Sequence, residues 1–173
     1  QIVYAGNPIS LLEKSTNGGQ TFSPATDGIT NTGFEFIAPL TMDPSDPARL
    51  WLGGGSLWRT RNNANNWSQA GMPLKGSATA IAVAPSDGNF VLAGTNQGYI
   101  HRTALGLSSS ADTDWPSVKV RSGTNIIVSA IAFDPTNRDI AYATVSNFGG
   151  RHVFRTVNGG QNWQAIDGAP PPS

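Results

Sequence analysis

The sequence predicts an all-β protein, a β-propeller or a partial β-propeller of about four four-stranded blades. Three observations favour this fold. A turn sequence recurs three times, an aromatic residue marks each repeat at a spacing of 45, 48 and 48 residues, and turn-forming residues are abundant while Glu and Lys are few. A period of this length is typical of propeller blades and is too long for most helical solenoids. The composition disfavours long helices and favours short strands joined by turns.

The recurring turn occupies residues 15–22, 60–67 and 156–163, with the sequences S-T-N-G-G-Q-T-F, T-R-N-N-A-N-N-W and T-V-N-G-G-Q-N-W. Asn and Gly tolerate the left-handed backbone that a tight hairpin turn requires. The aromatic residue that ends each turn begins the next strand, where its ring can cover a neighbouring sheet. We therefore expect equivalent hairpin turns, in which the structural residues are Ser15, Asn17, Gly19, Phe22, Thr60, Asn62, Trp67, Thr156, Asn158, Gly160 and Trp163.

Each repeat contains up to four strand patterns. The first, as in residues 80–85 and 129–135, is rich in Ala and ends at a proline, which cannot donate a hydrogen bond within a sheet. Small residues suit the crowded centre of a propeller. A second strand follows at once, a third leads into the turn, and a fourth begins at the aromatic residue. Residues 1–6 match a second strand, so the first blade lacks its inner strand and about fifteen strands are expected.

We expect one propeller region over residues 1–173, with approximate blades at 1–34, 35–76, 77–124 and 125–173. An inner strand for the first blade must come from elsewhere. The region is therefore expected to be a segment of a larger propeller of roughly six to eight blades, or to pair with a second copy. A closed ring of four blades is the alternative.

Two features depart from simple repetition of apolar strands. A basic residue stands in each third strand, at Lys14, Arg59, Arg102 and Arg155. We interpret this basic column as a solvated strand edge with local pairing rather than as a ligand site. The third repeat lacks the turn sequence, and Trp115 lies 12 positions after Thr103, where the corresponding spacing in the other repeats is 7. We interpret this longer segment as the result of sequence drift in a tolerant surface turn rather than as a functional loop.

Charge and composition exclude several classes of partner. The chain has 11 basic and 11 acidic residues and no basic tract, so we expect no nucleic-acid binding. The longest apolar run, 126–133, is far shorter than the roughly 20 residues of a membrane span, and no membrane association is expected. The absence of cysteine excludes disulfides and thiol nucleophiles.

The repeated turn resembles the Asp-box, or BNR repeat, of sialidases, xyloglucanases and sortilin-type receptors, written roughly as Ser/Thr-x-Asp-x-Gly-x-Thr-Trp. Here the Asp position is Asn17, Asn62 and Asn158, which keeps the side-chain acceptor and loses the charge. The sequence is most similar to xyloglucanases of family 74, which share the D-P-x-x-P turn, the strand and the box. The resemblance implies a β-propeller and an extracellular or periplasmic protein. It implies no function by itself, because one fold carries many functions.

Glycoside hydrolysis requires two carboxyl groups on opposite sides of one bond. Five of the nine aspartates, Asp43, Asp46, Asp87, Asp134 and Asp139, follow first strands, where turn capping is expected. Asp112 and Asp114 are the only pair outside the repeating pattern and are the weak catalytic candidates. Asp27, Asp167, Glu13 and Glu35 lack a local companion. The resemblance to family 74 places the catalytic Thr-Asp-x-Gly-Gly-x-Tyr stretch nearest to residues 95–99, where Asn96 replaces the carboxylate.

No metal site and no cofactor are expected. His101 and His152 lie in equivalent strands without a ligand at metal-binding spacing, so packed or exposed strand histidines are expected. Trp51 and Trp58 are candidates for stacking on sugars, although packing between blades is the commoner role of such residues.

The sequence thus favours a binding or scaffold propeller with polysaccharide or another protein as partner, and glycan as the favoured ligand class. The alternative is part of a secreted glycoside hydrolase, xyloglucanase-like or sialidase-like, with most catalytic residues outside this chain.

Overall fold

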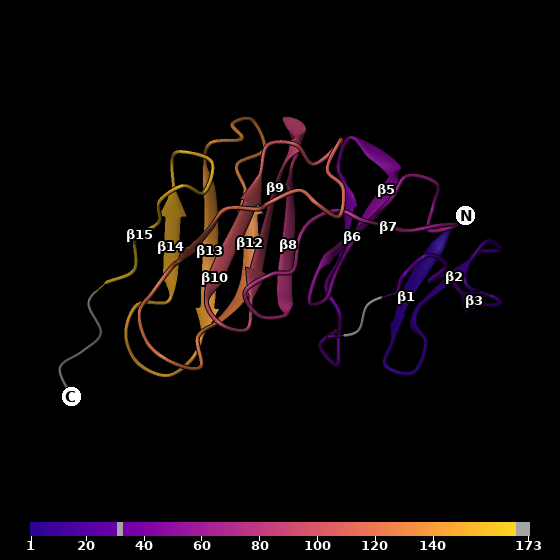
Figure 1. The fold of residues 1–173 in the computed structure, drawn as a ribbon, viewed down its shortest axis with the longest axis horizontal. Coiled ribbons are helices and arrows are strands. Elements are labelled where there is room, and N and C mark those ends of the chain that lie inside the picture. The colour runs from indigo at the N-terminus through magenta and orange to yellow at the C-terminus, as the bar shows by residue number, and fades with distance from the viewer. Residues whose placement is uncertain (31–32, 169–173) are drawn as a thin grey trace.

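A computed structural model describes residues 1–30 and 33–168 of the chain (Figure 1). The described residues form no helix and fifteen strands in four antiparallel sheets, which confirms the predicted all-β class and strand number. The strands are β1 (Val3–Asn7), β2 (Leu11–Ser15), β3 (Ser23–Pro24), β4 (Leu40–Asp43), β5 (Asp46–Gly53), β6 (Leu57–Thr60), β7 (Ser68–Gln69), β8 (Ala78–Ala84), β9 (Asp87–Thr95), β10 (Tyr99–Thr103), β11 (Ser117–Lys119), β12 (Ile127–Phe133), β13 (Ala141–Ser146), β14 (Val153–Thr156) and β15 (Gln164–Ala165).

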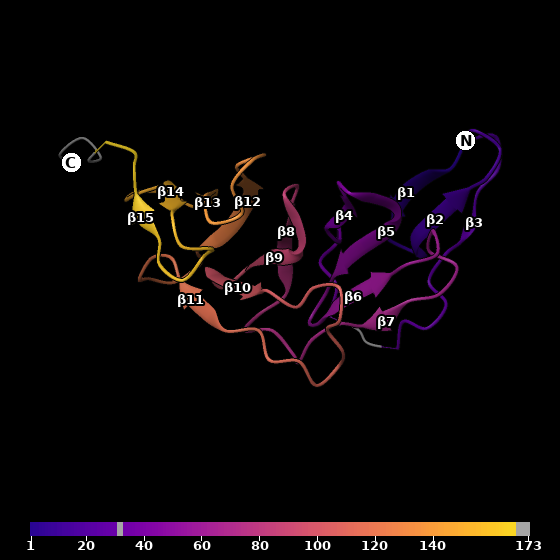
Figure 2. The same ribbon diagram turned by 90° about the horizontal axis from the view of Figure 1, so that it is seen from above.

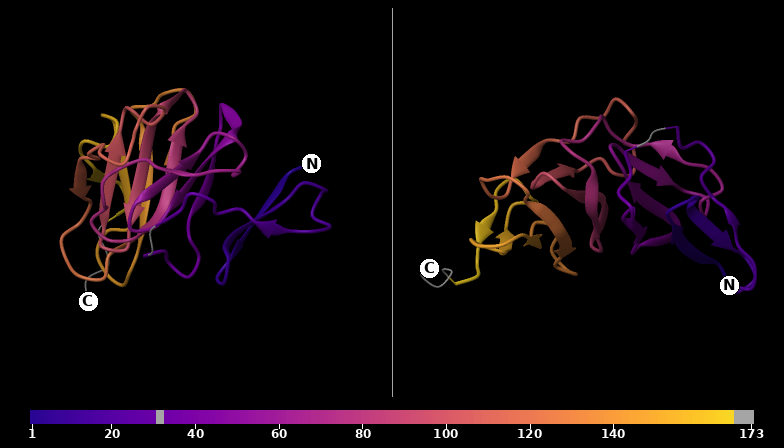
Figure 3. Two further views of the ribbon diagram at one scale, coloured as in Figure 1. Left: turned by 45° about the vertical axis from the view of Figure 1, so that its right-hand side comes forward. Right: turned by 90° about the horizontal axis from the view of Figure 1, so that it is seen from below.

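The four sheets are successive blades of a partial propeller. Each contains neighbouring strands in chain order: β1 to β3, β4 to β7, β8 to β11 and β12 to β15. Viewed from above, β1, β4, β8 and β12 lie on the inner side of an arc (Figure 2), and the view from below shows the same curvature (Figure 3). Within the described residues the first blade has three strands, and β1 is its inner edge.

The blades have two loop faces because their strands are antiparallel. One face carries the turns from second to third strands and the connections from each fourth strand to the next blade; we call it the connector face. The opposite face carries the turns from first to second strands and the turns from third to fourth strands. We call it the turn face.

Alternating side chains of each middle blade pack against different neighbours. Leu50 and Leu52 of β5 join the core shared with the first blade. Trp51 between them joins the core shared with the third blade, where its ring meets that of Trp115 at 5.9 Å and 70°. Trp51 is 0% exposed and Trp58 is 2% exposed, so sugar stacking by these two side chains is wrong and packing between blades is confirmed. Burying both faces of a sheet is what makes the blades interdependent.

The three turns at residues 15–22, 60–67 and 156–163, called the Asn turns below, share one set of hydrogen bonds. In the last turn, the Thr156 hydroxyl donates to Asn158 Oδ1 at 2.9 Å and accepts the Gly160 N–H at 3.0 Å. Asn158 Oδ1 also accepts the Asn162 N–H at 3.0 Å. Ser15 with Asn17 and Thr60 with Asn62 repeat this arrangement. A neutral amide oxygen therefore performs the acceptor role at all three turns.

Two of the aromatic residues that begin fourth strands, Trp67 and Trp115, also join adjacent blades. Trp67 Nε1 donates to the Ala25 carbonyl of the first blade at 2.8 Å. Trp115 Nε1 makes the equivalent bond to the Ala70 carbonyl of the second blade at 2.9 Å. Each bond reaches from one blade back to the fourth strand of the blade before it.

Two members of the basic column, Lys14 and Arg59, do not form the solvated strand edge with local pairing that the sequence suggested. Lys14 Nζ donates to the Asn63 carbonyl at 2.9 Å and to the Asn65 side chain, both in the turn of the next blade. Arg59 is 7% exposed and donates to the Gly106 carbonyl and to both oxygens of Ser109 in the third blade. The interpretation failed because these partners lie about fifty residues away in the sequence. We call this contact, from the basic residue of one blade to the turn of the next, the forward contact.

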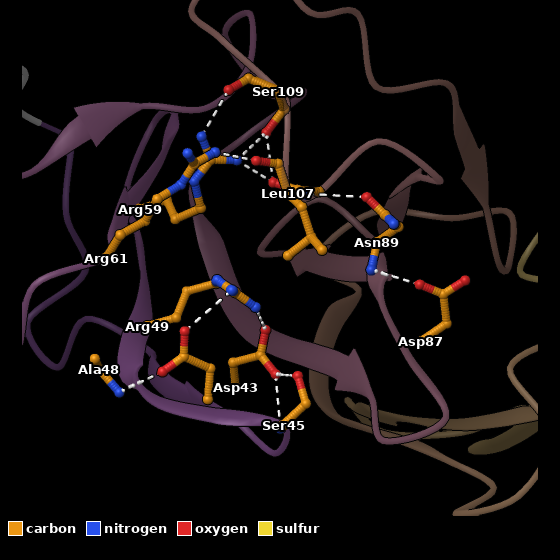
Figure 4. Close-up of polar contacts among 12 residues, drawn as sticks. Asp43, Ser45, Ala48, Arg49, Arg59, Arg61, Asp87, Asn89, Leu107 and Ser109 are labelled. Atoms are coloured by element: carbon orange, nitrogen blue, oxygen red, sulfur yellow. Dashed lines mark hydrogen bonds and ion pairs between the residues drawn. The ribbon is translucent and has the colours of Figure 1, made fainter.

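The lengthened loop at residues 104–114 takes the place of an Asn turn in the forward contact of the second blade. Figure 4 shows Arg59 and Arg61 reaching it from the second blade, and Arg61 donates to the Leu107 carbonyl. The Leu107 N–H in turn donates to Asn89 Oδ1 at 3.3 Å. The loop lies at the surface, with Leu105 57% exposed, and is also held by hydrogen bonds from the second blade and from Asn89. Burial lowers the pKa of the Arg59 guanidinium to about 10, with smaller effects from Arg61 and Arg49, so the group stays charged at neutral pH.

The aspartates that follow first strands cap turns, as expected for four of the five. The acceptors are Asp43 for the Ser45 N–H, Asp46 for the Ala48 N–H, Asp87 for the Asn89 N–H and Asp134 for the Thr136 N–H. Asp43 also pairs with Arg49 at 2.6 Å (Figure 4). Although burial opposes ionisation, the bonds from Ser45 and Arg49 hold the pKa of the Asp43 carboxyl below its usual value.

Replacing Asn158 with Ala should lower the free energy of unfolding by about 1 kcal/mol, because two donors in the turn lose their acceptor. Asn158→Asp keeps an acceptor oxygen in the same place and should lose less. Urea unfolding followed by circular dichroism measures both variants. Equal losses in the two variants would show that the acceptor oxygen does not stabilise the turn.

Arg59→Met should lower the free energy of unfolding by roughly 2 to 3 kcal/mol, because the carbonyls of Gly106 and Ser109 lose a charged donor at a buried site. Arg59→Lys should fall between the wild type and Arg59→Met, since lysine makes the same kind of contact at position 14. A stability for Arg59→Met within about 0.5 kcal/mol of the wild type would mean that the forward contact is energetically neutral.

Candidate functional site

The main candidate site is a cavity of about 580 Å³ on the connector face, between the first two blades. One wall is the turn from β1 to β2, and the other is the segment that leads into β4. The described residues that line it are Gly6, Asn7, Pro8, Ile9, Leu11, Phe34, Glu35, Phe36, Ile37 and Ala38. We call it the connector cavity.

Local sequence shapes both walls of the connector cavity. Asn7 Oδ1 accepts the Ile9 N–H at 2.8 Å, which folds the first wall into a tight turn and leaves Ile9 95% exposed. On the second wall, Phe34 is half-buried against the core between the blades and holds the segment in place. Phe36 and Ile37 follow it with 79% and 78% of their surface exposed. Large exposed apolar groups beside a cavity are typical of a binding surface.

Glu35 is the one carboxylate among the described lining residues, and it has a partner from another blade. Asn96 Nδ2 donates to Glu35 Oε1 at 2.8 Å, and Asn96 Oδ1 accepts the Ser77 N–H at 3.1 Å. Glu35 thus has no companion nearby in the sequence, as expected, but it has a distant one. The sequence carried no local signal for this pair, because the two residues are 61 positions apart.

Asn96 occupies the position at which the resemblance to family 74 places a catalytic carboxylate. Its amide is bound at both ends and points its donor at Glu35, and an amide cannot transfer a proton as an acid or base. The described lining residues of the connector cavity thus offer the carboxylate of Glu35, the side-chain amide of Asn7 and exposed apolar groups. This set can bind and orient a neutral polar ligand, whereas two-carboxylate hydrolysis needs a second acid.

The weak catalytic candidates Asp112 and Asp114 lie elsewhere. Asp114 borders a smaller cavity of about 190 Å³ with Lys75, His101 and Trp115, and Asp112 is exposed and does not border it. This cavity shares no described residue with the connector cavity. The structure therefore does not bring Asp112 and Asp114 together around one space.

The two histidines differ in their surroundings. His101 is 4% exposed, its Nε2 accepts the Lys75 N–H at 3.0 Å, and its Nδ1 lies 3.0 Å from the Trp115 carbonyl. Burial lowers the pKa of its imidazole, which is neutral at physiological pH. His152 is half-buried, with Nδ1 at 3.4 Å from the Val145 carbonyl. Within residues 1–30 and 33–168, no cluster of three or more acidic, His or Cys side chains has metal-binding geometry, and no helix is long and apolar enough to cross a membrane.

The fold and the loop faces define the chain as part of a β-propeller. Its sequence is similar to a xyloglucanase of Paenibacillus, with 22% identity over 98% of this chain and 20% of the enzyme. It is also similar to a probable oligoxyloglucan-reducing end-specific xyloglucanase of Neosartorya fischeri, with 26% identity over 98% of this chain and 22% of the enzyme. This chain thus spans about a fifth of the length of these relatives.

A solved structure supports the same fold. The crystal structure of an ancestral GH74 enzyme superposes on 96% of this chain and 22% of its own chain, with a TM-score of 0.73 and 24% identity. No protein-family model matches the chain. The chain is therefore a propeller segment related to xyloglucanases.

Asn96→Asp should lower stability at pH 7 on the order of 1 kcal/mol, because it sets a second negative charge against Glu35. Two adjacent carboxyls have a raised pKa in the folded state, so the loss should shrink as the pH falls toward 4 and the pair binds a proton. Asn96→Ala is the control, since its loss should not change over this range. Chemical denaturation at several pH values measures both, and a loss for Asn96→Asp that does not vary with pH would contradict the contact.

Proposed function

We propose that this chain is the glycan-binding segment of a larger, secreted Asp-box propeller protein, and that it binds a neutral β-glucan such as xyloglucan on the connector face. The observation that carries the proposal is the connector cavity, which sets exposed Phe36 and Ile37 beside the polar groups of Asn7 and Glu35. Sugars are bound in this way, with an apolar ring face on an aromatic side chain and hydroxyls on polar groups.

Three further points support the proposal. The relatives with similar sequences are xyloglucanases, which act on a neutral polysaccharide. The described lining residues include no cation, which suits an uncharged ligand. In the Asn turns an amide oxygen accepts hydrogen bonds at the Asp position of the Asp-box pattern, which supports the assignment. This assignment and the ligand class favour an extracellular or periplasmic location.

A second candidate function is that the chain forms one side of a glycoside hydrolase site, with the other catalytic groups outside residues 1–173. The similarity to xyloglucanases favours it. On the geometry, Glu35 is the carboxylate of this chain best placed to take part, because it faces the connector cavity and is oriented by Asn96. Asp112 and Asp114 remain weaker candidates.

Phe36→Ala should weaken binding of a xyloglucan oligosaccharide by up to roughly tenfold, since aromatic stacking contributes about 0.5 to 1.5 kcal/mol and about 1.4 kcal/mol corresponds to a factor of ten. Leu105→Ala is the matched control: it removes an apolar side chain that is 57% exposed outside the connector cavity. Isothermal titration calorimetry measures the affinities, and circular dichroism checks the fold. Equal affinity of Phe36→Ala and the wild type would place the glycan elsewhere.

A reducing-sugar assay on the same samples separates the two candidate functions. Retention of xyloglucan without release of sugar supports binding. Release of sugar that Glu35→Gln abolishes would establish the hydrolase reading instead.

A further inference from the structure

The segment that carries the chain from the second blade into β8, residues 74–78, is bound by both blades. We call it the entry segment. The N–H groups at its ends, of Leu74 and Ala78, each donate at 2.9 Å to a carbonyl of the second blade, that of Gly55 and that of Gly54 respectively. Two side chains of the third blade bind the residues between these ends.

His101 of β10 makes the first of these two contacts. Its Nε2 accepts the Lys75 N–H at 3.0 Å, and its Nδ1 lies 3.0 Å from the Trp115 carbonyl. A carbonyl can only accept, so Nδ1 carries the proton and donates it to this bond, while the unprotonated Nε2 accepts from Lys75. Only the neutral imidazole makes both bonds, because protonation of Nε2 places a second N–H against that of Lys75.

Asn96, in the turn from β9 to β10, makes the second contact. Its Oδ1 accepts the Ser77 N–H at 3.1 Å, and its own backbone N–H donates to the Ser77 carbonyl at 3.0 Å. Gly76 lies so close to this side chain that an added Cβ would be 2.5 Å from Asn96 Oδ1. The Nδ2 group of the same amide donates to Glu35 of the connector cavity at 2.8 Å. A continuous series of contacts therefore runs from His101 through the entry segment to Glu35.

The charged groups that face the His101 imidazole, among the described residues, are Lys75 of the entry segment and Asp114, which borders the same small cavity. Its neighbours across β9 and β11, Ala93 and Ser117, are uncharged. Burial is the main cause that lowers the pKa of the imidazole below its ordinary value of 6.5, and Lys75 lowers it further, while Asp114 and the bond to a backbone carbonyl oppose the shift. Both bonds of the neutral imidazole are therefore present above pH 6.5 and are lost as the pH falls through the lowered pKa.

We propose that His101 is a positioning residue of the connector cavity and makes binding of a neutral β-glucan there sensitive to acid. The neutral imidazole holds the entry segment where Ser77 fixes Asn96, and Asn96 in turn orients Glu35. Protonation of Nε2 breaks the bond to Lys75, so the entry segment loses one of its two side-chain contacts with the third blade and Glu35 loses its fixed orientation. His101 is not among the described lining residues of the cavity, so it acts through Asn96 rather than on the ligand. The effect on the ligand rests on the proposed function, whereas the effect on the entry segment rests on the hydrogen bonds of this chain.

His101→Gln tests the proposal, because a glutamine amide can accept from one N–H and donate to one carbonyl but does not titrate. The affinity of the wild type for a xyloglucan oligosaccharide, measured by calorimetry across the pH range in which NMR shows His101 to titrate, should fall roughly threefold to tenfold, as for the loss of one hydrogen bond. The fall should be absent in His101→Gln. His152→Gln is the matched control, since it removes the other of the two histidines and should keep the fall. An equal fall in His101→Gln, a constant wild-type affinity, or an imidazole that stays neutral until the protein unfolds would overturn the proposal.

Amide hydrogen exchange of the unliganded chain separates this proposal from the proposed function. The protection factors of the Lys75 and Ser77 amides should fall at least roughly threefold as His101 binds its proton, because the entry segment opens more often. They should not fall in His101→Gln, and the amides of β5 are the internal reference. Protection factors that stay constant while His101 titrates would show that it does not position the entry segment, whatever the chain binds. Absence of glucan binding at every pH would instead contradict the proposed function.

Discussion

Two of the three joints between blades depend on the forward contact, in which Lys14 or Arg59 of one blade binds the turn of the next. A propeller blade is a small sheet with two apolar faces, so it is stable only between neighbours. Apolar packing supplies the attraction but does not fix how far one blade slides over another. A charged donor that binds turn carbonyls of the next blade fixes the relative position of the two blades. The bonds from Trp67 and Trp115 to carbonyls of the preceding blade fix the same position from the second blade of each pair. The Asn turn at residues 60–67 therefore stabilises the joint between the first two blades as well as its own hairpin.

The long loop of the third blade shows that the forward contact constrains geometry rather than sequence. Residues 104–114 lack the turn sequence, yet the carbonyls of Gly106 and Ser109 meet Arg59 where Asn63 meets Lys14. The additional length is accommodated because the loop is anchored at Asn89 and against Arg61. Arginine suits this joint better than lysine because its planar group reaches two carbonyls and a hydroxyl at once.

The sequence predicted much of the fold because local signals determine it. Three local signals indicated the fifteen strands and their grouping into blades: prolines after strands, Asn and Gly in turns, and the aromatic residue that recurs after each turn. Contacts between residues 47 to 61 positions apart were not predictable in this way, and they include Arg59 with its loop and Glu35 with Asn96. The basic column was visible as a pattern, but alternation alone does not tell a solvent face from a face that the next blade covers. For the same reason the connector cavity could not be assembled from one repeat: its walls come from the turn of one blade and the entry to the next.

The division of the two loop faces connects the fold to the proposed function. The turn face is occupied by contacts that hold the blades together, and its aspartates are engaged in capping. The connector face carries the exposed apolar groups at Ile9, Phe36 and Ile37 and the oriented carboxylate of Glu35. Asn96 links Glu35 of the connector cavity to the third blade. A ligand in this cavity would therefore contact residues whose positions depend on the joints between blades.

A double-mutant cycle between Arg59 and Ser109 is the most direct test of the claim that the forward contact stabilises the joint. Arg59→Met, Ser109→Ala and the double variant are compared with the wild type by urea unfolding. The 3.0 Å bond between the guanidinium and the Ser109 hydroxyl predicts a coupling free energy of at least about 0.5 kcal/mol. Strictly additive losses would contradict it.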